Sequence, residues 1–349
     1  MTVALASPAG AVRYRDSVDH FQHGLLRLMN LSAGEFDRWL ALAEAAETDD
    51  LLQRLAAGWA RLRPPPATSA PSDGPVSAGP GGRAGRVWHS AIAESPDYGV
   101  AISDDGSHAW LVGWDGTAFV YEQRPPVYEE AYFEGDKLAA GGYGDYTAQA
   151  GWRLEKAARQ VREMRERTGI GAGRVLDIGS GYGFFRVALE EAGYHHEGLE
   201  VSSFARAVAQ TSYGHHSHAG TLADHYAEWT ERYDVVTMFD LIEHVSDPDE
   251  FMRQVAHVLR PGGAVGIKTP NVDCPEAQVF GPHYHSLKRE HLAYFTARSL
   301  GATAALAGLQ ECDVRTASHL LVGFVGEERT GFWERELRGA DLVAWYRKP

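Results

Sequence analysis

The chain has few of the features that mark secreted or membrane-spanning proteins. Its 349 residues contain only two cysteines, Cys274 and Cys312, which excludes a disulfide scaffold and a cysteine-rich zinc module. No apolar run approaches the ~18 residues that a membrane-spanning helix needs. Residues 1–16 lack the apolar core and basic flank of a signal peptide. We therefore expect a cytoplasmic protein with no membrane partner.

Positive charge is also scarce. Lys and Arg number 33 against 47 Asp and Glu, which gives a formal net charge of −14. No Lys/Arg-rich run is present, and an acidic chain repels the phosphates of nucleic acids. A nucleic-acid partner is therefore not expected. The content of 44% hydrophobic and 23% charged residues is that of an ordinary globular protein.

The N-terminal part of the chain is divided by a low-complexity stretch. Residues 64–85 are dominated by Pro, Gly, Ser and Ala, which predicts a flexible linker. Before it, Ser32 and Glu35 fit a capping box, and apolar residues then recur at helical spacing. We expect a helical domain over residues 1–63. Two roles stay open for it: a dimerisation element that gives a homodimer, and a cover over the substrate.

The pattern changes after the linker. Residues 86–127 carry short β-like runs separated by Asp-Gly pairs, a strong hairpin signal, so we expect a small antiparallel β meander. Residues 128–150 are rich in Tyr and Gly and are interpreted as a lid segment. Strand and helix patterns then alternate over residues 151–330, which is typical of a parallel α/β sheet. Residues 331–349 are interpreted as a C-terminal tail.

One strand–turn–helix unit carries the chemistry. Residues 175–178 form an apolar strand, followed by glycines at 179, 181 and 183 and by a helical pattern. Such a turn presents free backbone N–H groups, and Glu200, ending the next strand, can accept hydrogen bonds from a ribose diol. Asp177 would oppose a pyrophosphate but suits the sulfonium and ammonium of S-adenosylmethionine. The pattern favours that cofactor over a nicotinamide, whose turn would place a glycine at Phe184.

Four blocks resemble, in order, those of the class I S-adenosylmethionine-dependent methyltransferases, in the subgroup that includes the ubiquinone-type O-methyltransferases. They are VLDIGSGYG (175–183), GLEVS (198–202), YDVVTMFDLIEHVSDP (233–248) and LRPGGAVGIKTPN (259–271), with REHLAYFTARSL (289–300) as a weaker fifth. The resemblance implies an α/β fold with a Rossmann-like seven-stranded sheet. Residues 1–127 have no counterpart in the family's core, which leaves the substrate open.

The resemblance also assigns a cofactor site. In the family, the glycine turn wraps the methionine part, the position of Asp177 reaches the ammonium, and that of Glu200 holds the ribose. The segment after the third strand contacts the adenine, and that after the fourth flanks the sulfonium. Lid tyrosines either attract the sulfonium through their rings or pack on the core. The expected cofactor-binding residues are Asp177, Gly179, Ser180, Gly181, Gly183, Glu200, Val201, Thr221, Leu222, Asp240, Leu241, Tyr143 and Tyr146.

Histidines supply the candidates for acid–base work. Methyl transfer to a hydroxyl must remove a proton, and histidine titrates in a suitable range. His244 and His291, in the third and fifth blocks, are the two candidate catalytic bases; packing or loop hydrogen bonding is the alternative for each. His283 and His285 could hold a divalent ion together with a nearby acid, but we expect no metal.

The expected activity is transfer of the methyl group of S-adenosylmethionine to an O or N atom of a small molecule, in secondary metabolism. The alternative is a non-catalytic protein of the same fold that recruits a partner through its N-terminal domain. The array of Asp177, the glycine turn and Glu200 argues against a decayed site. An RNA methyltransferase is disfavoured by the net charge.

Overall fold

The computed structural model describes three short strands before residue 114 and most of the chain from residue 128 onward. The described residues are 85–89, 98–103, 109–113, 128, 130–134, 146–280, 286, 291–318 and 327–349. Their elements are β1 (Gly85–His89), β2 (Tyr98–Ser103), β3 (Ala109–Gly113), α4 (Glu130–Glu134), α6 (Ala150–Thr168), β4 (Arg174–Ile178), α7 (Phe184–Glu191), β5 (His195–Glu200), α8 (Ser203–Tyr213), β6 (Ser217–Ala219), the 3₁₀ turns η2 (Leu222–Asp224) and η3 (Tyr226–Trp229), β7 (Tyr233–Phe239), the 3₁₀ turn η4 (Ile242–His244), α9 (Pro248–Val258), β8 (Leu259–Pro270), α10 (Pro275–Phe280), α11 (Ala297–Leu306), β9 (Gln310–Ala317), α13 (Glu327–Arg335) and β10 (Asp341–Arg347).

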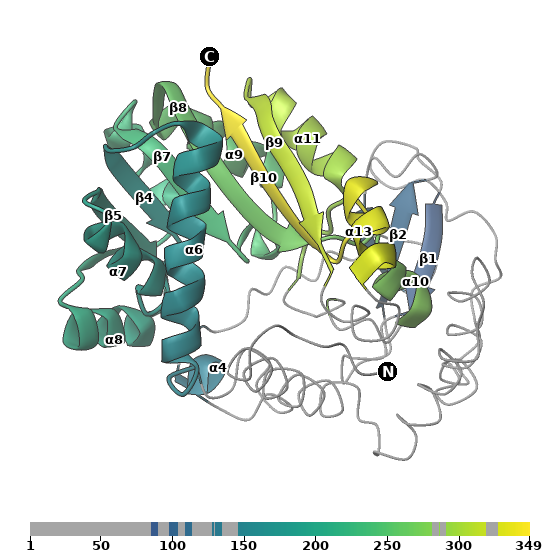
Figure 1. Ribbon diagram of the computed structural model, residues 1–349, viewed down its shortest axis with the longest axis horizontal. Coiled ribbons are helices and arrows are strands. Elements are labelled where there is room, and N and C mark those ends of the chain that lie inside the picture. The colour runs from purple at the N-terminus through teal and green to yellow at the C-terminus, as the bar shows by residue number, and fades with distance from the viewer. Residues whose placement is uncertain are drawn as a thin grey trace.

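Seven strands form one sheet in the order β6-β5-β4-β7-β8-β10-β9 (Figure 1). Strands β4 to β8 pair in parallel, and β10 runs antiparallel to β8 and β9. This is the seven-stranded Rossmann-like sheet expected from the sequence. The chain leaves β4 on one side to form β5 and returns on its other side to form β7. Sheets of this kind bind ligands beside such a reversal, at the carboxyl ends of the strands.

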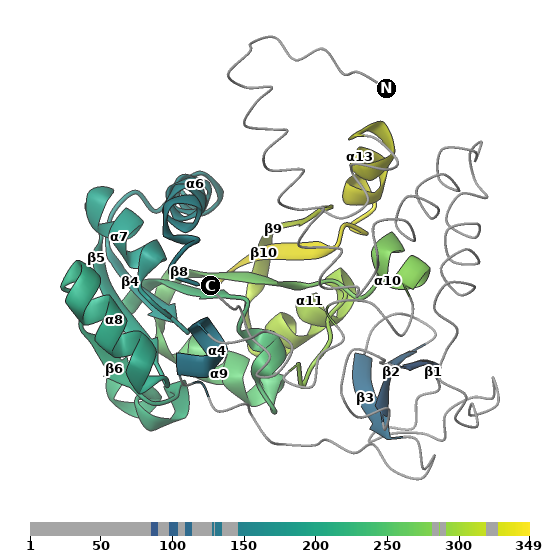
Figure 2. The same ribbon diagram turned by 90° about the horizontal axis from the view of Figure 1, so that it is seen from below.

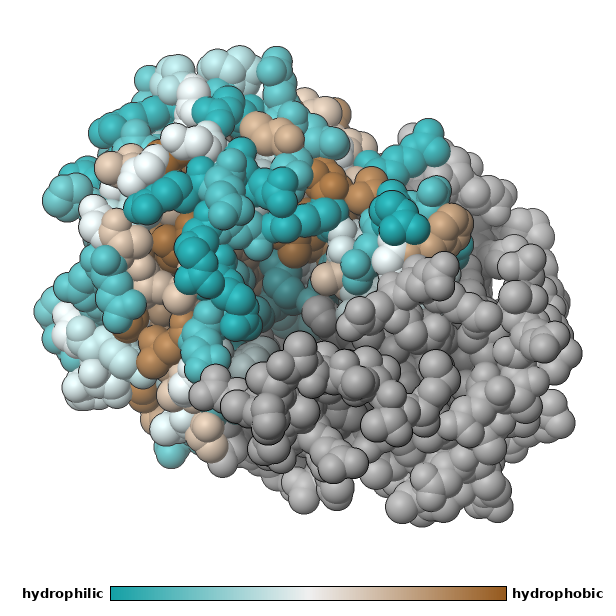
Figure 3. Space-filling view, viewed as in Figure 1, coloured by the Kyte–Doolittle hydropathy of each residue, from teal (hydrophilic) through white to brown (hydrophobic). Residues whose placement is uncertain are grey.

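Helices cover both faces of the sheet, so neighbouring strand residues enter two different cores. Val175 and Val235 pack with residues of α6 and α7 on one face. Leu176 and Val236 pack with residues of α9 and α11 on the other. Figure 2 shows the two helical layers on opposite sides of the sheet. In Figure 3 the outer side of α6 is mostly hydrophilic, as expected for a helix with one buried face.

The end of the chain is part of the sheet. β10 lies between β8 and β9, with Val343 opposite Lys268, and Leu342, Ala344 and Trp345 are buried. The interpretation of residues 331–349 as a tail is therefore wrong, and the α/β domain continues past residue 330. A lone strand whose partners lie far away in the sequence carries no local pairing signal, which explains the error.

The strands before residue 114 form a separate antiparallel sheet in the order β1-β2-β3, which confirms the expected β meander. The expected helical domain at 1–63 and the linker up to residue 84 lie outside the described residues. Within the described part of the chain, no helix combines the length and apolarity needed to cross a membrane.

Candidate active site

A cavity of about 760 Å³ opens at the carboxyl ends of β4, β5 and β7, a volume in the range of small-molecule sites. The expected site residues in its wall are Asp177, Gly179, Ser180, Gly181, Glu200, Val201, Thr221, Leu222, Asp240, Leu241, His244 and Tyr146. Gly183 and His291 are not part of the wall, and Tyr143 lies outside the described residues. The structure thus brings together residues that are far apart in the sequence.

The turn between β4 and α7 depends on glycine. Gly179, Gly181 and Gly183 have φ angles of 70°, 50° and 84°, in the left-handed region that other residues rarely adopt. A Cβ at Gly179 would also lie 2.8 Å from Leu241 Cδ1. Gly183 is the N-cap of α7, so it starts the helix and does not face the cavity.

Two buried carboxylates stand at the strand ends. Glu200 accepts hydrogen bonds from the backbone amides of Gly181 and Ser202, each at 2.8 Å. Asp177 accepts one from the Thr237 hydroxyl at 2.9 Å. Their residues are only 6% and 5% exposed, and among the described residues neither carboxylate forms an ion pair.

Burial raises the pKa of both groups. It raises the pKa of Asp177 to about 7, against the Thr237 hydrogen bond and the charge of Arg186, which lower it. Burial also raises the pKa of Glu200, although its backbone hydrogen bonds and the charge of Arg206 act in the opposite direction. A buried carboxylate without a counter-ion is stabilised by a cationic ligand, so both groups favour one.

The segment after β6 presents Thr221 and Leu222 to the cavity. Asp224 shapes this segment: its Oδ2 accepts hydrogen bonds from the Thr221 amide at 2.7 Å and hydroxyl at 2.8 Å. The same two residues form the capping box of η2. Asp224 therefore holds the turn and is not in the cavity wall.

Asp240 directly follows β7 in a left-handed conformation, with φ of 56°. Its Oδ1 accepts a hydrogen bond from Lys268 Nζ at 2.7 Å, and Lys156 Nζ lies 3.9 Å from its Oδ2. Burial works to raise the pKa of Asp240, but the charges of Lys268 and Lys156 outweigh it and hold the pKa below the ordinary value. Asp240 is therefore ionised at neutral pH.

The lid segment adds an aromatic wall to the cavity. Burial raises the pKa of Tyr146 to about 12, so the phenol is neutral, and the Arg153 guanidinium lies 3.7 Å from the centre of its ring. Glu134, which ends α4, accepts hydrogen bonds from the Tyr182 hydroxyl at 2.5 Å and the Thr147 hydroxyl at 2.6 Å. Because Tyr182 belongs to the glycine turn, α4 is attached directly to that turn.

His244 lines the cavity, and His291 lies behind it. Their ring centres are 4.8 Å apart and their planes are nearly perpendicular. The amides of Leu292 and Ala293 donate to the Glu243 carbonyl at 2.7 and 3.0 Å, which fixes this segment against η4. The two candidate bases are therefore one pair, of which only His244 faces the cavity.

A backbone carbonyl fixes the tautomer of His291. His291 Nδ1 lies 2.8 Å from the Ser286 carbonyl oxygen; the carbonyl can only accept, so Nδ1 donates and the neutral ring keeps its lone pair on Nε2.

Glu243 accepts a hydrogen bond from the Thr269 hydroxyl at 2.9 Å, and burial, reinforced by the charge of Asp240, raises its pKa to about 8. Ligand atoms of Glu243, His244 and His291 lie within 4.8 Å of one another. The alternative metal ligands His283 and His285 lie outside the described residues.

Comparison with known proteins identifies the family. A family described as "Methyltransferase domain" matches residues 150–312. The ubiquinone biosynthesis O-methyltransferase of Pseudomonas savastanoi pv. phaseolicola is 32% identical over 175 residues, which cover 44% of this chain and 72% of that protein. The chain belongs to the class I S-adenosylmethionine-dependent methyltransferases. The Pseudomonas aeruginosa enzyme of the same name is 29% identical over 175 residues, with the same coverage. A solved S-adenosylmethionine-dependent methyltransferase from Archaeoglobus fulgidus is 16% identical, covers 58% of this chain and 99% of its own, and has a TM-score of 0.45.

The cavity of this methyltransferase fits S-adenosylmethionine. The cofactor carries an ammonium and a ribose diol, which match Asp177 and Glu200, two buried carboxylates that form no ion pair among the described residues. Its carboxylate matches Arg153, a cation in the wall beside Tyr146 and the glycine turn. When bound, S-adenosylmethionine supplies an electrophilic methyl group on a positively charged sulfur. Arg153 and Glu134 escaped the sequence analysis because neither lies in a recognisable motif.

Proposed function

We propose that this methyltransferase methylates a hydroxyl oxygen of a small molecule and that His244 removes the hydroxyl proton. The observation that carries the proposal is the position of His244 in the cavity wall, with His291 packed behind it at 4.8 Å. The names of the Pseudomonas relatives, which are O-methyltransferases, support an oxygen acceptor. The narrower assignment to secondary metabolism is also part of the proposal. It rests on residues 1–127, which lie outside the matched range 150–312.

The chain's own residues suggest how the proton moves. A base must lie within hydrogen-bond reach of the acceptor, and of the two histidines only His244 is in the wall. His291 is a positioning residue in this proposal. The Ser286 carbonyl orients its ring, and the ring in turn limits the orientations of His244. Alignment of acceptor and methyl group supplies the rest of the rate acceleration.

The test uses an acceptor found by screening phenols and alcohols with labelled S-adenosylmethionine. His244→Ala should lower kcat by ~10²–10⁴-fold and abolish the acidic limb of the pH–rate profile, with cofactor affinity nearly unchanged. His291→Ala should have a smaller effect on kcat, and His216→Ala, at an exposed histidine, should have none. If His244→Ala keeps more than about a tenth of the wild-type kcat, the proposal is wrong. Loss of wild-type activity in a chelator would instead make the Glu243, His244 and His291 group a metal site.

A further inference from the structure

One cation in the cavity wall has no hydrogen-bond partner among the described residues, although its ammonium lies 5.5 Å from the centre of the Trp152 ring. Lys156 of α6 lines the cavity, and its ammonium lies 3.9 Å from Asp240 Oδ2, too far for a hydrogen bond. No hydrogen bond from this ammonium is found among the described residues. Its side chain is 27% exposed. Three N–H donors at the edge of a small-molecule site are therefore available to a ligand.

Asp240 has a closer counter-ion than Lys156. Lys268 Nζ lies 2.7 Å from Asp240 Oδ1 and 2.9 Å from Asp341 Oδ2, so Lys268 bridges the end of β7 to the start of β10. The group contains two carboxylates and two ammonium ions and is neutral as a whole. Because Lys268 satisfies Asp240 at close range, the charge of Lys156 can act on an anion in the cavity.

The position of Lys156 separates it from the cofactor's own carboxylate. Arg153 lies one turn earlier on α6 and stacks on Tyr146, whose hydroxyl lies close to the glycine turn that holds the methionine part. Lys156 instead faces Asp240 and Lys268 at the ends of β7 and β8. This is the side of the cavity away from Thr221 and Leu222, where the adenine is expected.

We propose that Lys156 binds an anionic group of the acceptor, so that the substrates are hydroxy acids whose carboxylate pairs with this ammonium. The inference deepens the proposed function and rests on it. Neutral phenols and alcohols of the same shape offer the Lys156 ammonium no charged hydrogen-bond acceptor and bind more weakly.

The experiment measures binding of paired acids and amides to the full-length protein loaded with S-adenosylhomocysteine. The probes are 4-hydroxybenzoate, 3,4-dihydroxybenzoate and 4-hydroxyphenylacetate, each against its amide, followed by isothermal titration calorimetry. In the wild type we expect at least one acid to bind about 10–100-fold more tightly than its amide, the range of a charged hydrogen bond. Lys156→Gln should remove this preference, and Lys156→Arg should keep most of it. Arg159→Gln removes the same charge from an exposed position of the same helix and should change nothing.

Two results would overturn the inference. One is equal binding of acids and amides across the panel, including no binding of either. The other is a Lys156→Gln variant that loses S-adenosylmethionine affinity more than tenfold, because Lys156 would then hold the cofactor carboxylate. Both results are binding measurements and are distinct from a failure of the proposed function. That failure would be seen as unchanged turnover in the His244 variant, whatever the charge of the acceptor.

Discussion

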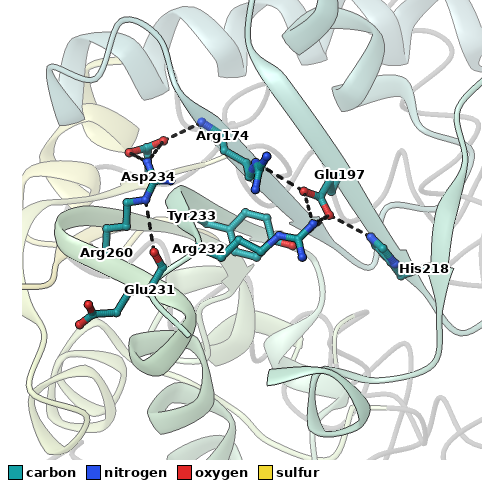
Figure 4. A network of polar contacts seen from close by, with 8 residues as sticks. All are labelled: Arg174, Glu197, His218, Glu231, Arg232, Tyr233, Asp234 and Arg260. Carbon is teal, nitrogen blue, oxygen red and sulfur yellow. Dashed lines mark hydrogen bonds and ion pairs between the residues drawn. The ribbon is translucent and has the colours of Figure 1, made fainter. Parts of the chain in front are cut away.

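Acidic side chains lie in different surroundings at the two edges of the central sheet, the edge where β4, β5 and β7 begin and the edge where these strands end. At the edge where β4, β5 and β7 begin, Glu197 and Asp234 are each bonded to arginine side chains (Figure 4). At the edge where these strands end, Asp177 and Glu200 are buried with hydrogen bonds but form no ion pair among the described residues, whereas Asp240 there is paired with Lys268. The first edge stabilises the fold. Buried carboxylates that form no ion pair, such as those at the second edge, are typical of ligand-binding sites.

Glu197 represents the first edge. It accepts two hydrogen bonds from Arg232 at 2.9 and 2.8 Å and one from His218 at 2.9 Å, and Arg174 lies 3.6 Å away. Partial burial alone would raise the pKa of Glu197, but the bonds from His218 and Arg232 lower it below the ordinary value. Burial decides the pKa of Asp177 and Glu200 at the other edge, and carboxylates perturbed in that way are typical of functional sites. Asp240, at that same edge, resembles Glu197 instead, because the charges of Lys268 and Lys156 lower its pKa. The direction of the pKa shift therefore separates Asp177 and Glu200 from the ion-paired carboxylates.

The largest effect on cofactor affinity is expected from replacing Glu200. Glu200→Ala removes the carboxylate that would hold the ribose hydroxyls and that accepts the amides of Gly181 and Ser202. Loss of such charged hydrogen bonds typically costs ~1.5–3 kcal/mol, or roughly 10–100-fold in affinity. Calorimetric titration with S-adenosylmethionine and S-adenosylhomocysteine measures it. Because both ligands carry the ribose, both should weaken to a similar degree; wild-type affinity in the variant would contradict the placement of the ribose beside β5.

A second prediction concerns pH and Asp177. With a pKa of about 7, this carboxyl is mostly protonated at pH 6 and mostly ionised at pH 8, so affinity for the cationic S-adenosylmethionine should rise about tenfold over that range. Binding near pH 7 should also release a proton, which appears as a dependence of the calorimetric enthalpy on the buffer. Asp177→Asn should bind more weakly and lose both effects.

The stability of the ligand-free protein should move in the opposite direction. The raised pKa means that the native state binds this proton more tightly than the unfolded state does. The free energy of unfolding therefore falls as the pH rises from about 4 to about 7. Comparison of thermal unfolding of wild type and Asp177→Asn at pH 5 and pH 8 isolates the contribution. Parallel curves for the two proteins would show that Asp177 is not perturbed.

The sequence predicts the site best where it is built from local structure. The glycine turn, Asp177 and Glu200 come from two consecutive strands and the turn between them, so spacing alone places them together. Nothing local indicates that Lys156, Asp240, Lys268 and Asp341 meet, because they come from four elements spread over more than half of the chain. The same lack of a local signal explains why the sequence does not predict strand β10, which supplies Asp341.

The histidine pair illustrates an intermediate case. The blocks around His244 and His291 make both candidates for the same role, and either strand end opens toward the cavity. The sequence cannot rank them, because they differ in their distance from the cavity. Backbone hydrogen bonds to the Glu243 carbonyl hold the His291 segment behind η4. Local motifs therefore predict which residues gather at a site, and packing decides which of them reaches the ligand.

The smallest effect on binding is expected at the opposite edge. Glu197→Gln leaves Arg232, Arg174 and His218 without their shared anion, which should lower the free energy of unfolding by about 1–3 kcal/mol at pH 7 and the Tm by several degrees. Because the pKa of Glu197 is lowered in the fold, its contribution is fully present above the ordinary value of 4.5 and is lost as the pH falls through the lowered value. The difference in Tm between wild type and variant should therefore shrink below about pH 4. Affinity for S-adenosylmethionine at pH 8 should stay within about twofold of wild type, since Glu197 does not line the cavity. A variant that keeps its Tm but loses cofactor would reverse the roles of the two edges.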